Sequence, residues 1–187
     1  MVRKVLLGVG AVLVLLVLVI ATRPSTFHIE RSITIAAPPE VVFAHIDDFH
    51  EWAAWSPWEK LDPQMKRTYG GAPKGTGATY GWTGNDQVGE GRMTITEAVP
   101  PSKVAIKLEF IKPFAMVNDT LFVLTPAGEG TKLTWNMDGR HNFVSKGMSL
   151  FMDMDKQVGP DFERGLAAIK DSSESKKTPE APKSQNP

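Results

Sequence analysis

The sequence predicts an α+β domain in which a bent antiparallel sheet of about seven strands wraps around one long carboxy-terminal helix. Three observations carry this prediction. Short segments of alternating apolar and polar side chains recur from Phe27 to Asp138, and such alternation is typical of strands. Turns rich in glycine and proline separate these segments by only a few residues, which favours neighbouring antiparallel strands. Apolar residues between Met148 and Ile169 then recur at helical spacing.

Length and composition fit one globular domain with an additional segment at each end. The chain has 187 residues, of which 22% are charged, and it has no cysteine. The absence of cysteine excludes disulfides, thiolate metal sites and cysteine nucleophiles. Segment 24–170 carries 18 acidic and 15 basic side chains. A weakly acidic domain without a basic stripe does not attract a phosphate backbone, so we expect no nucleic-acid partner.

The amino-terminal segment is long and apolar. Val5 to Ala21 are 17 consecutive apolar or glycine residues, which as a helix would span roughly 25 Å, near the lower limit for crossing a bilayer. Two interpretations remain open for residues 1–23. One is a retained transmembrane anchor, which the length of the run favours. The other is a cleaved secretory signal, for which Val19-Ile20-Ala21 is a loose match to a cleavage site.

The basic residues that flank this segment bear on its orientation. Arg3 and Lys4 precede the apolar run, and Arg23 follows it. The positive-inside rule weakly favours an amino terminus in the cytoplasm. We therefore expect a single-pass membrane protein that contacts the membrane through residues 5–21, with its domain in an extracytoplasmic space such as the periplasm.

The first strand is predicted at Phe27 to Ile35. Arg31 interrupts its apolar face and so needs a carboxylate partner or a place at the rim of the sheet. Proline and glutamate at Pro39-Glu40 suit the first turn of a short helix. The tryptophan-rich stretch 49–63 continues as a second helical piece that ends near Ser56-Pro57. Six further strands are predicted at 65–71, 78–83, 89–97, 103–111, 117–125 and 131–138.

The carboxy-terminal helix is predicted to cover the apolar face of the sheet. Gly159-Pro160 interrupts its pattern, and because proline lacks a backbone donor and clashes with the preceding turn, we expect a kink or a break there. Serine, lysine, proline and glutamate dominate from Asp171 onward. Such a composition cannot build a core. The prediction is therefore a folded domain over 24–170 and a disordered tail over 171–187.

Several short motifs together resemble a known family. They include Ile35-x-Ala37-Pro38-x-Glu40-x-Val42-Phe43, Trp52-x-x-Trp55-Ser-Pro-Trp-Glu59, Trp82-x-Gly84-Asn85 and Phe162-Glu-x-Gly165-Leu166. The pattern resembles the START/Bet v 1-like helix-grip superfamily, also called SRPBCC, and within it the polyketide cyclase/dehydrase-like branch. The resemblance covers about Phe27 to Lys170. It implies a helix-grip fold that holds a lipid, polyketide or other apolar ligand between sheet and helix, and it carries over no catalytic residue.

A sheet and a helix that meet at one end and splay at the other leave a cavity. Trp52, Trp55 and Trp58 lie within seven residues, and we expect them to form a wall at the lid end of this cavity, with packing in the core as the alternative. Methionines suit a pocket that must adapt to an irregular guest. The residues predicted to line the cavity are Trp55, Trp58, Tyr80, Trp82, Glu90, Phe110, Phe122, Trp135, Met148 and Met152.

A search for catalytic chemistry finds no constellation. None of the four histidines stands in a metal-ligand spacing, and no serine lies in a nucleophile elbow, so we predict neither a metal nor a cofactor. An inward-facing Glu90 would have a raised pKa and could act as a general acid or base. In the alternative, Glu90 forms a structural pair with Arg31, and Asn85 caps a turn. Glu59 and Asp62 are the other polar candidates.

Three functions remain. The leading hypothesis is a membrane-tethered binding module for a hydrophobic small molecule or lipid. The second is an enzyme of the polyketide cyclase or dehydratase type that uses the same cavity, and the third is an envelope interaction protein with a filled core. The sequence gives neither the ligand nor the oligomeric state.

Overall fold

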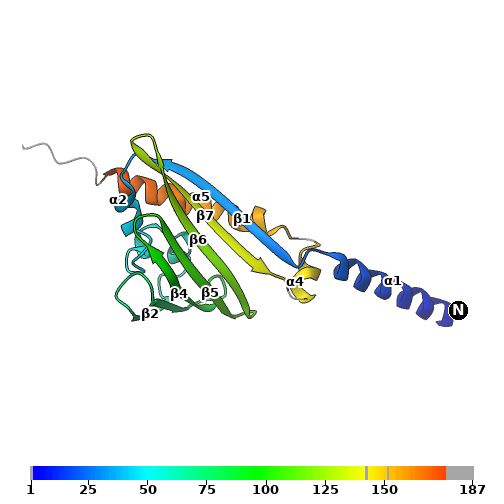
Figure 1. The fold of residues 1–187 in the computed structure, drawn as a ribbon. Helices are drawn as coiled ribbons and strands as arrows, with labels where there is room; N and C mark the ends of the chain where they lie inside the picture. Colours follow the sequence, from blue (N-terminus) through cyan, green and yellow to red (C-terminus); the bar gives the residue numbers. More distant parts are fainter. Residues whose placement is uncertain (1, 142, 151, 176–187) are drawn as a thin grey trace, which may run out of the picture.

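The structure is a computed structural model that describes residues 2–141, 143–150 and 152–175. Its first element, α1 (Val2–Thr22), is apolar on all sides and none of its residues is buried. By length and composition, α1 can cross a membrane. It projects away from the domain in Figure 1, where it is dark blue. Three residues, 23–25, connect it to the first strand.

A single antiparallel sheet of seven strands forms the body of the molecule, as predicted. From β2 to β7 each strand pairs with the next one in the chain, and β1 closes the order beside β7. The short turns between the strands dictate this meander. The strands are β1 (Thr26–Ile35), β2 (Lys66–Gly71), β3 (Ala78–Thr83), β4 (Glu90–Val99), β5 (Lys103–Lys112), β6 (Met116–Ala127) and β7 (Gly130–Arg140).

Short helices close one end of the sheet. They are α2 (Pro39–Ala44), α3 (Trp52–Trp55) and η1 (Pro57–Lys60), a turn of 3-10 helix. Prolines start α2 and η1, where a missing backbone donor costs nothing. Their apolar side chains join those of the sheet in one core, which includes Val42, Phe43, Trp52 and Trp55.

The carboxy-terminal helical region consists of α4 (Phe143–Met148) and α5 (Met154–Ser175). The break expected at Gly159-Pro160 does not occur, because α5 continues through Pro160. The interruption lies between the end of α4 at Met148 and the start of α5 at Met154 instead. There the side chain of Asp153 accepts a hydrogen bond from the backbone N–H of Asp155 at 3.1 Å and caps the start of α5.

Arg31 fastens α5 to β1. Its guanidinium donates two hydrogen bonds to Asp155, at 2.8 and 3.0 Å, and one to Glu163 at 2.8 Å. A Cβ on Gly159 would overlap the guanidinium, so glycine lets Arg31 cross the helix. The predicted need of Arg31 for a carboxylate partner is therefore met. Figure 1 shows α5, in orange, running along β1.

The end of α5 differs from the predicted domain boundary. The helix extends through Ser175, and the side chain of Ser173 is fully buried. Glu174 also accepts a hydrogen bond from the backbone N–H of Ala36 at 2.7 Å. Residues 171–175 of the predicted disordered tail are therefore helical, and residues 176–187 lie outside the described part of the chain.

Candidate functional site

A large pocket of about 1060 Å³ is lined by residues at the end of the sheet where β1 begins and β5 ends. Figure 1 shows that α1 joins the domain at this end of the sheet. It is bounded by the β5–β6 turn on one side and by α4 and the start of α5 on the other. Its apolar lining comes from three phenylalanines, four methionines, an isoleucine and a valine: Phe27, Phe110, Phe114, Met116, Met148, Met152, Met154, Ile111 and Val117.

The charged groups of the pocket are mostly paired. Glu109 accepts hydrogen bonds from Lys107 at 2.9 Å and from Arg92 at 2.8 Å. These two cations hold the pKa of the Glu109 carboxyl below its usual value. Arg140 also lines the pocket, and no described carboxylate pairs with it. The pocket is therefore an apolar space with a cationic margin.

His141 is the one imidazole among the described residues of the pocket wall. Its ring packs against Phe27, with 5.1 Å between the ring centroids. Its Nδ1 is buried without a hydrogen-bond partner in the described part of the chain. Burial lowers the pKa of His141, and the nearby charge of Lys146 lowers it further. The ring is thus neutral at neutral pH and can accept a proton.

Unpaired polar atoms continue inward from the pocket along β6 and β7. The Oδ1 of Asn118, the Oγ1 of Thr120 and the Nε1 of Trp135 are buried and have no hydrogen-bond partner among the described residues. Asn118 and Thr120 lie two and four residues beyond Met116 of the pocket wall, and Thr120 is opposite Met137 in the sheet register. Such groups are rare in folded proteins because each carries a desolvation cost. We call these three residues the polar row.

The tryptophan-rich stretch does not line the large pocket. Trp52 and Trp55 are buried, and their indole N–H groups donate to the backbone carbonyls of Ile46 and His45. The ring of Trp135 stacks on Phe162 of α5, with 3.9 Å between centroids. These rings fill the space between sheet and helix at this end, so the predicted cavity wall is core.

The ten residues predicted to line the cavity therefore separate into two groups. Phe110, Met148 and Met152 line the large pocket. The other seven do not line it, and most lie in the packed core. They are Trp55, Trp58, Tyr80, Trp82, Glu90, Phe122 and Trp135.

The polar candidates have structural partners away from the pocket. Glu59 accepts hydrogen bonds from Arg67 at 2.7 Å and from Tyr80 at 2.5 Å. Burial, together with the bond to Glu59, raises the pKa of Tyr80. Glu90 pairs with Lys112 at 2.7 Å, so the suggested pair with Arg31 is wrong.

The remaining two polar candidates shape a turn. Asp62 accepts a hydrogen bond from the backbone N–H of Asn85 at 2.7 Å, and Asn85 in turn accepts one from the N–H of Gln87 at 2.9 Å. Asn85 therefore caps the β3–β4 turn, as the alternative interpretation expected. Within the described ranges, no group of three or more acidic or histidine side chains is arranged to hold a metal ion.

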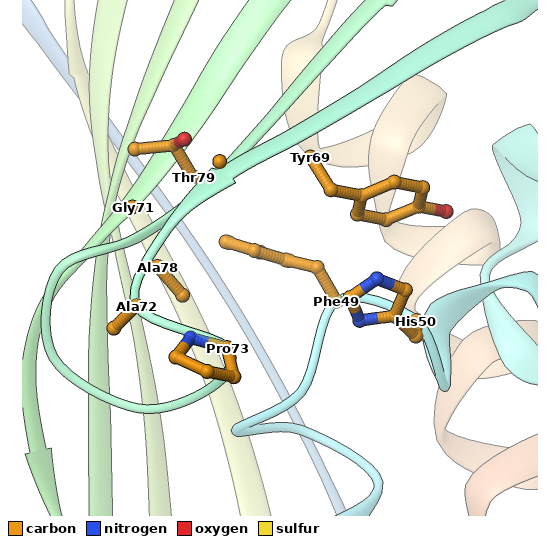
Figure 2. A pocket seen from close by; sticks show the side chains of 9 residues that line it. Phe49, His50, Tyr69, Gly71, Ala72, Pro73, Ala78 and Thr79 are labelled. Atoms are coloured by element: carbon orange, nitrogen blue, oxygen red, sulfur yellow. The ribbon is translucent and has the colours of Figure 1, made fainter.

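A second, smaller pocket of about 210 Å³ lies at the β2–β3 hairpin. Figure 2 shows Phe49, His50 and Tyr69 on one side of it and the hairpin turn with Pro73 on the other. His50 stacks on Tyr69, with 4.2 Å between the ring centroids. The volume is too small for a drug-sized guest, which needs about 300 Å³ or more.

Sequence reasoning missed the β5–β6 turn and His141. The turn reads Lys112-Pro113-Phe114-Ala115-Met116, and the side chain of Phe114 is 63% exposed. A hairpin turn normally carries polar residues and glycine. A phenylalanine and a methionine at a hairpin turn, where polar residues and glycine are usual, were the signal that the sequence offered for a binding surface.

Residues 26–174 match the model of the family described as polyketide cyclase / dehydrase and lipid transport. The chain belongs to this family. The resemblance to the polyketide cyclase/dehydrase-like branch of the helix-grip superfamily is therefore confirmed. No curated protein matches the chain in sequence.

Solved structures show the same fold at low sequence identity. A protein from Chromobacterium violaceum is 17% identical, with a TM-score of 0.56 over 81% of this chain and 99% of the other. The Aha1 dimer from Colwellia psychrerythraea is 16% identical, with a TM-score of 0.57 over 81% and 99%. The di-domain ARO/CYC protein StfQ from the steffimycin biosynthetic pathway is 10% identical, with a TM-score of 0.59 over 81% of this chain and 52% of StfQ. These similarities establish the fold alone.

Proposed function

We propose that this protein is a membrane-tethered binding module that holds a hydrophobic small molecule or lipid in the large pocket. The observation that carries the proposal is the pocket itself, with about 1060 Å³ of space and a predominantly apolar wall. Small-molecule sites commonly have volumes of about 300–1000 Å³ and a few polar groups on an apolar wall. The family description, which includes lipid transport, agrees with this chemistry.

The lining favours a guest of irregular shape. Met116, Met148, Met152 and Met154 all face the pocket. The unbranched side chain of methionine changes rotamer easily and adapts to different surfaces. A single acyl chain or a small polycyclic molecule fits this description better than a strongly polar metabolite.

The polar row suggests that the guest has one hydrogen-bonding group. The Asn118 side-chain oxygen offers an acceptor, and the Thr120 hydroxyl offers both a donor and an acceptor, whereas the Trp135 indole lies deeper in the packed core. A hydroxyl or carbonyl at the inner end of the guest would satisfy one of these atoms and recover its desolvation cost. We therefore propose an amphipathic guest whose polar end points toward β6 and β7.

In this proposal α1 is a retained anchor for residues 1–23, and the binding domain follows on the extracytoplasmic side. The flanking basic residues Arg3 and Lys4 support this orientation. The alternative, a cleaved signal, would release the same domain from the membrane. A mass measurement of the mature protein distinguishes them, because cleavage removes the first 21 or so residues.

The first experiment is native mass spectrometry of the full chain, purified in detergent from its own cells, with extraction of any bound molecule. We expect a co-purifying lipid or apolar metabolite. A mass without a guest, combined with no uptake of a fluorescent fatty acid or a fluorescent sterol, would contradict the proposal. It would favour the third hypothesis, an interaction protein.

A pair of substitutions localises the guest. Met152→Trp places a larger ring in the wall of the pocket, and we expect it to weaken binding of the fluorescent fatty acid about tenfold or more, equivalent to about 1.4 kcal/mol. Val99→Trp is the control, because Val99 is exposed at the end of β4 that lies away from the large pocket. Equal affinity of the two variants would place the guest elsewhere.

His141 supports a second function, that of a dehydratase. A neutral imidazole in an apolar pocket can take a proton from a carbon next to a carbonyl and return it to a departing hydroxyl, which leaves as water. The name of the family includes such chemistry. If the extracted guest loses water on incubation with the protein, His141→Gln should stop the loss while the guest still binds. Unchanged conversion in this variant would exclude His141.

A further inference from the structure

Six apolar side chains face solvent at or beside the large pocket, and we call them the pocket rim. Five of them line the pocket: Ile111, Phe114 and Val117 at the β5–β6 turn, and Met148 and Met152 at the end of α4 and after it. The sixth, Phe143, begins α4 two residues before Ser145 of the pocket wall. We propose that this pocket rim is a docking surface for the bilayer that holds α1, and that the guest passes between pocket and bilayer through it. This inference rests on the proposed function. It adds the surface that contacts the bilayer and the route by which the guest enters the pocket.

Exposed apolar side chains are concentrated at this rim. Outside α1, nine large apolar side chains of the described residues are exposed, and six of them belong to the pocket rim. Phe114 is 63% exposed and Phe143 is 55% exposed. Scattered exposed apolar residues need no explanation, whereas a cluster around a pocket marks an interaction site.

The position of α1 identifies the partner as a membrane. Its last turns pack against α4, where the Cδ1 of Ile20 lies 3.6 Å from the place a Cβ would take on Gly147. Figure 1 shows α4, in yellow, beside the domain end of α1, and the β5–β6 turn at the same end of the sheet. A helix that spans a bilayer and ends at Thr22 therefore brings the pocket rim to the surface of that bilayer.

Basic side chains accompany the apolar rim. Arg23, Arg140 and Lys146 surround this end of the domain, and in the described part of the chain none of them pairs with a carboxylate. Of the acidic groups near the rim, Glu90, Glu109 and Asp153 pair with lysine or arginine side chains. Asp119, two residues after Val117, has no ion-pair partner in the described part of the chain. Apolar side chains flanked by unpaired cations are the pattern of surfaces that bind membranes with anionic lipids.

The test uses the absence of native cysteine. A single cysteine at Phe143→Cys carries an environment-sensitive fluorophore in the full chain, reconstituted into nanodiscs of phosphatidylcholine and phosphatidylglycerol. Some of the lipids carry a nitroxide quencher on the acyl chain. Phe143 is part of the pocket rim but does not line the pocket, so its label reports on docking and not on a bound guest.

The matched control is Glu129→Cys at the β6–β7 turn. β6 has 12 residues and separates the two turns by roughly 40 Å. We expect the label at position 143 to be quenched several-fold and the label at position 129 to remain bright. Equal brightness at the two positions would overturn the proposal, as would contact between labels of two copies without lipid quenching.

A second measurement tests the route of the guest. Phe143→Asp adds a charge to the rim, and we expect it to slow the loading of a fluorescent fatty acid from the nanodisc several-fold while its affinity in detergent stays the same. An unchanged loading rate would overturn the route. If the unmodified protein does not bind the fluorescent fatty acid in detergent, the proposed binding function is refuted instead. The two failures are therefore distinguishable.

Discussion

The two ends of the sheet contain similar side chains and use them differently. At the end closed by α3 and η1, aromatic rings stack on one another, and Trp55, Phe122 and Phe162 are fully buried. At the end that joins α1, the rings of Phe114 and Phe143 face outward around a pocket of about 1060 Å³. The first end holds the fold together, and the second leaves its apolar surface available for a guest.

The difference follows from what covers each end. α5 is fixed to β1 by Arg31 and lies along the β1 edge of the sheet, where Phe162 meets Trp135 of β7. α4, which precedes α5 in the chain, packs against α1 instead. Among the described residues, no helix fills the space above the sheet at the end where the pocket lies. The pocket is therefore a consequence of the break between α4 and α5.

The largest effect should come from a substitution at the filled end. Trp135→Ala removes a ring that is 3% exposed, and we expect it to lower the free energy of unfolding by about 3–5 kcal/mol. Met152→Ala at the open end should change it by less than about 0.5 kcal/mol, because Met152 is 40% exposed. Denaturation in detergent measures both. Equal losses would mean that the two ends are packed alike.

Gly159→Ala should have the next largest effect. The new methyl group would overlap the guanidinium of Arg31, which is held by Asp155 and Glu163, and we expect a loss of about 1–3 kcal/mol in the free energy of unfolding. Gly147→Ala in α4 is the matched control, since its methyl group would lie 3.6 Å from Ile20. Tolerance of both substitutions would show that Arg31 does not fix α5.

Thr120→Val examines the polar row between the two ends. The Oγ1 of Thr120 has no partner among the described residues, so we expect the substitution to raise the free energy of unfolding by about 1 kcal/mol. The affinity for a guest with a hydroxyl or carbonyl should fall at the same time. Thr125→Val, at an exposed position of the same strand, is the control. A destabilised Thr120→Val would indicate that a water molecule satisfies the hydroxyl.

The smallest effect concerns acid stability at the Arg31 contact. Arg31 lowers the pKa of Asp155 below its ordinary value of 3.8 by hydrogen bonding. The contribution of Asp155 to stability is therefore complete above pH 3.8 and is lost as the pH falls through the lower pKa of the folded state. Asp155→Asn should flatten this part of the stability curve. Identical acid unfolding of the two proteins would contradict it.

The fold could be predicted because its signals are local. Alternation in β5 and β7, and turns such as Pro100-Pro101-Ser102, depend only on neighbouring residues. The meander follows from the shortness of the turns. The start of α5 also has a local signal, the N-terminal cap formed by Asp153. The prediction placed the break at Gly159-Pro160 instead, because glycine and proline are the stronger helix-breaking residues, and this was wrong.

The site was harder to predict because burial depends on distant partners. Trp55 and Phe114 are both large apolar residues beside a proline-containing segment, and the sequence does not separate them. Trp55 meets Phe122 and Trp135, which come from strands far along the chain, and is buried by them. Phe114 meets no such ring in the described part of the chain and is 63% exposed. Only the packing of α4 and α5 decides which ring lines a pocket.

The three residues between α1 and β1 limit what the domain can do. Fully extended, they reach roughly 10 Å. With α1 in a bilayer, the domain therefore cannot travel to a second membrane, as a soluble shuttle does. In the proposed membrane-tethered form, the domain would stay at one membrane, and a protein that carries the guest onward would have to come to it. If α1 is retained as an anchor, as proposed, the three-residue connection limits transfer of a guest to the membrane that holds α1.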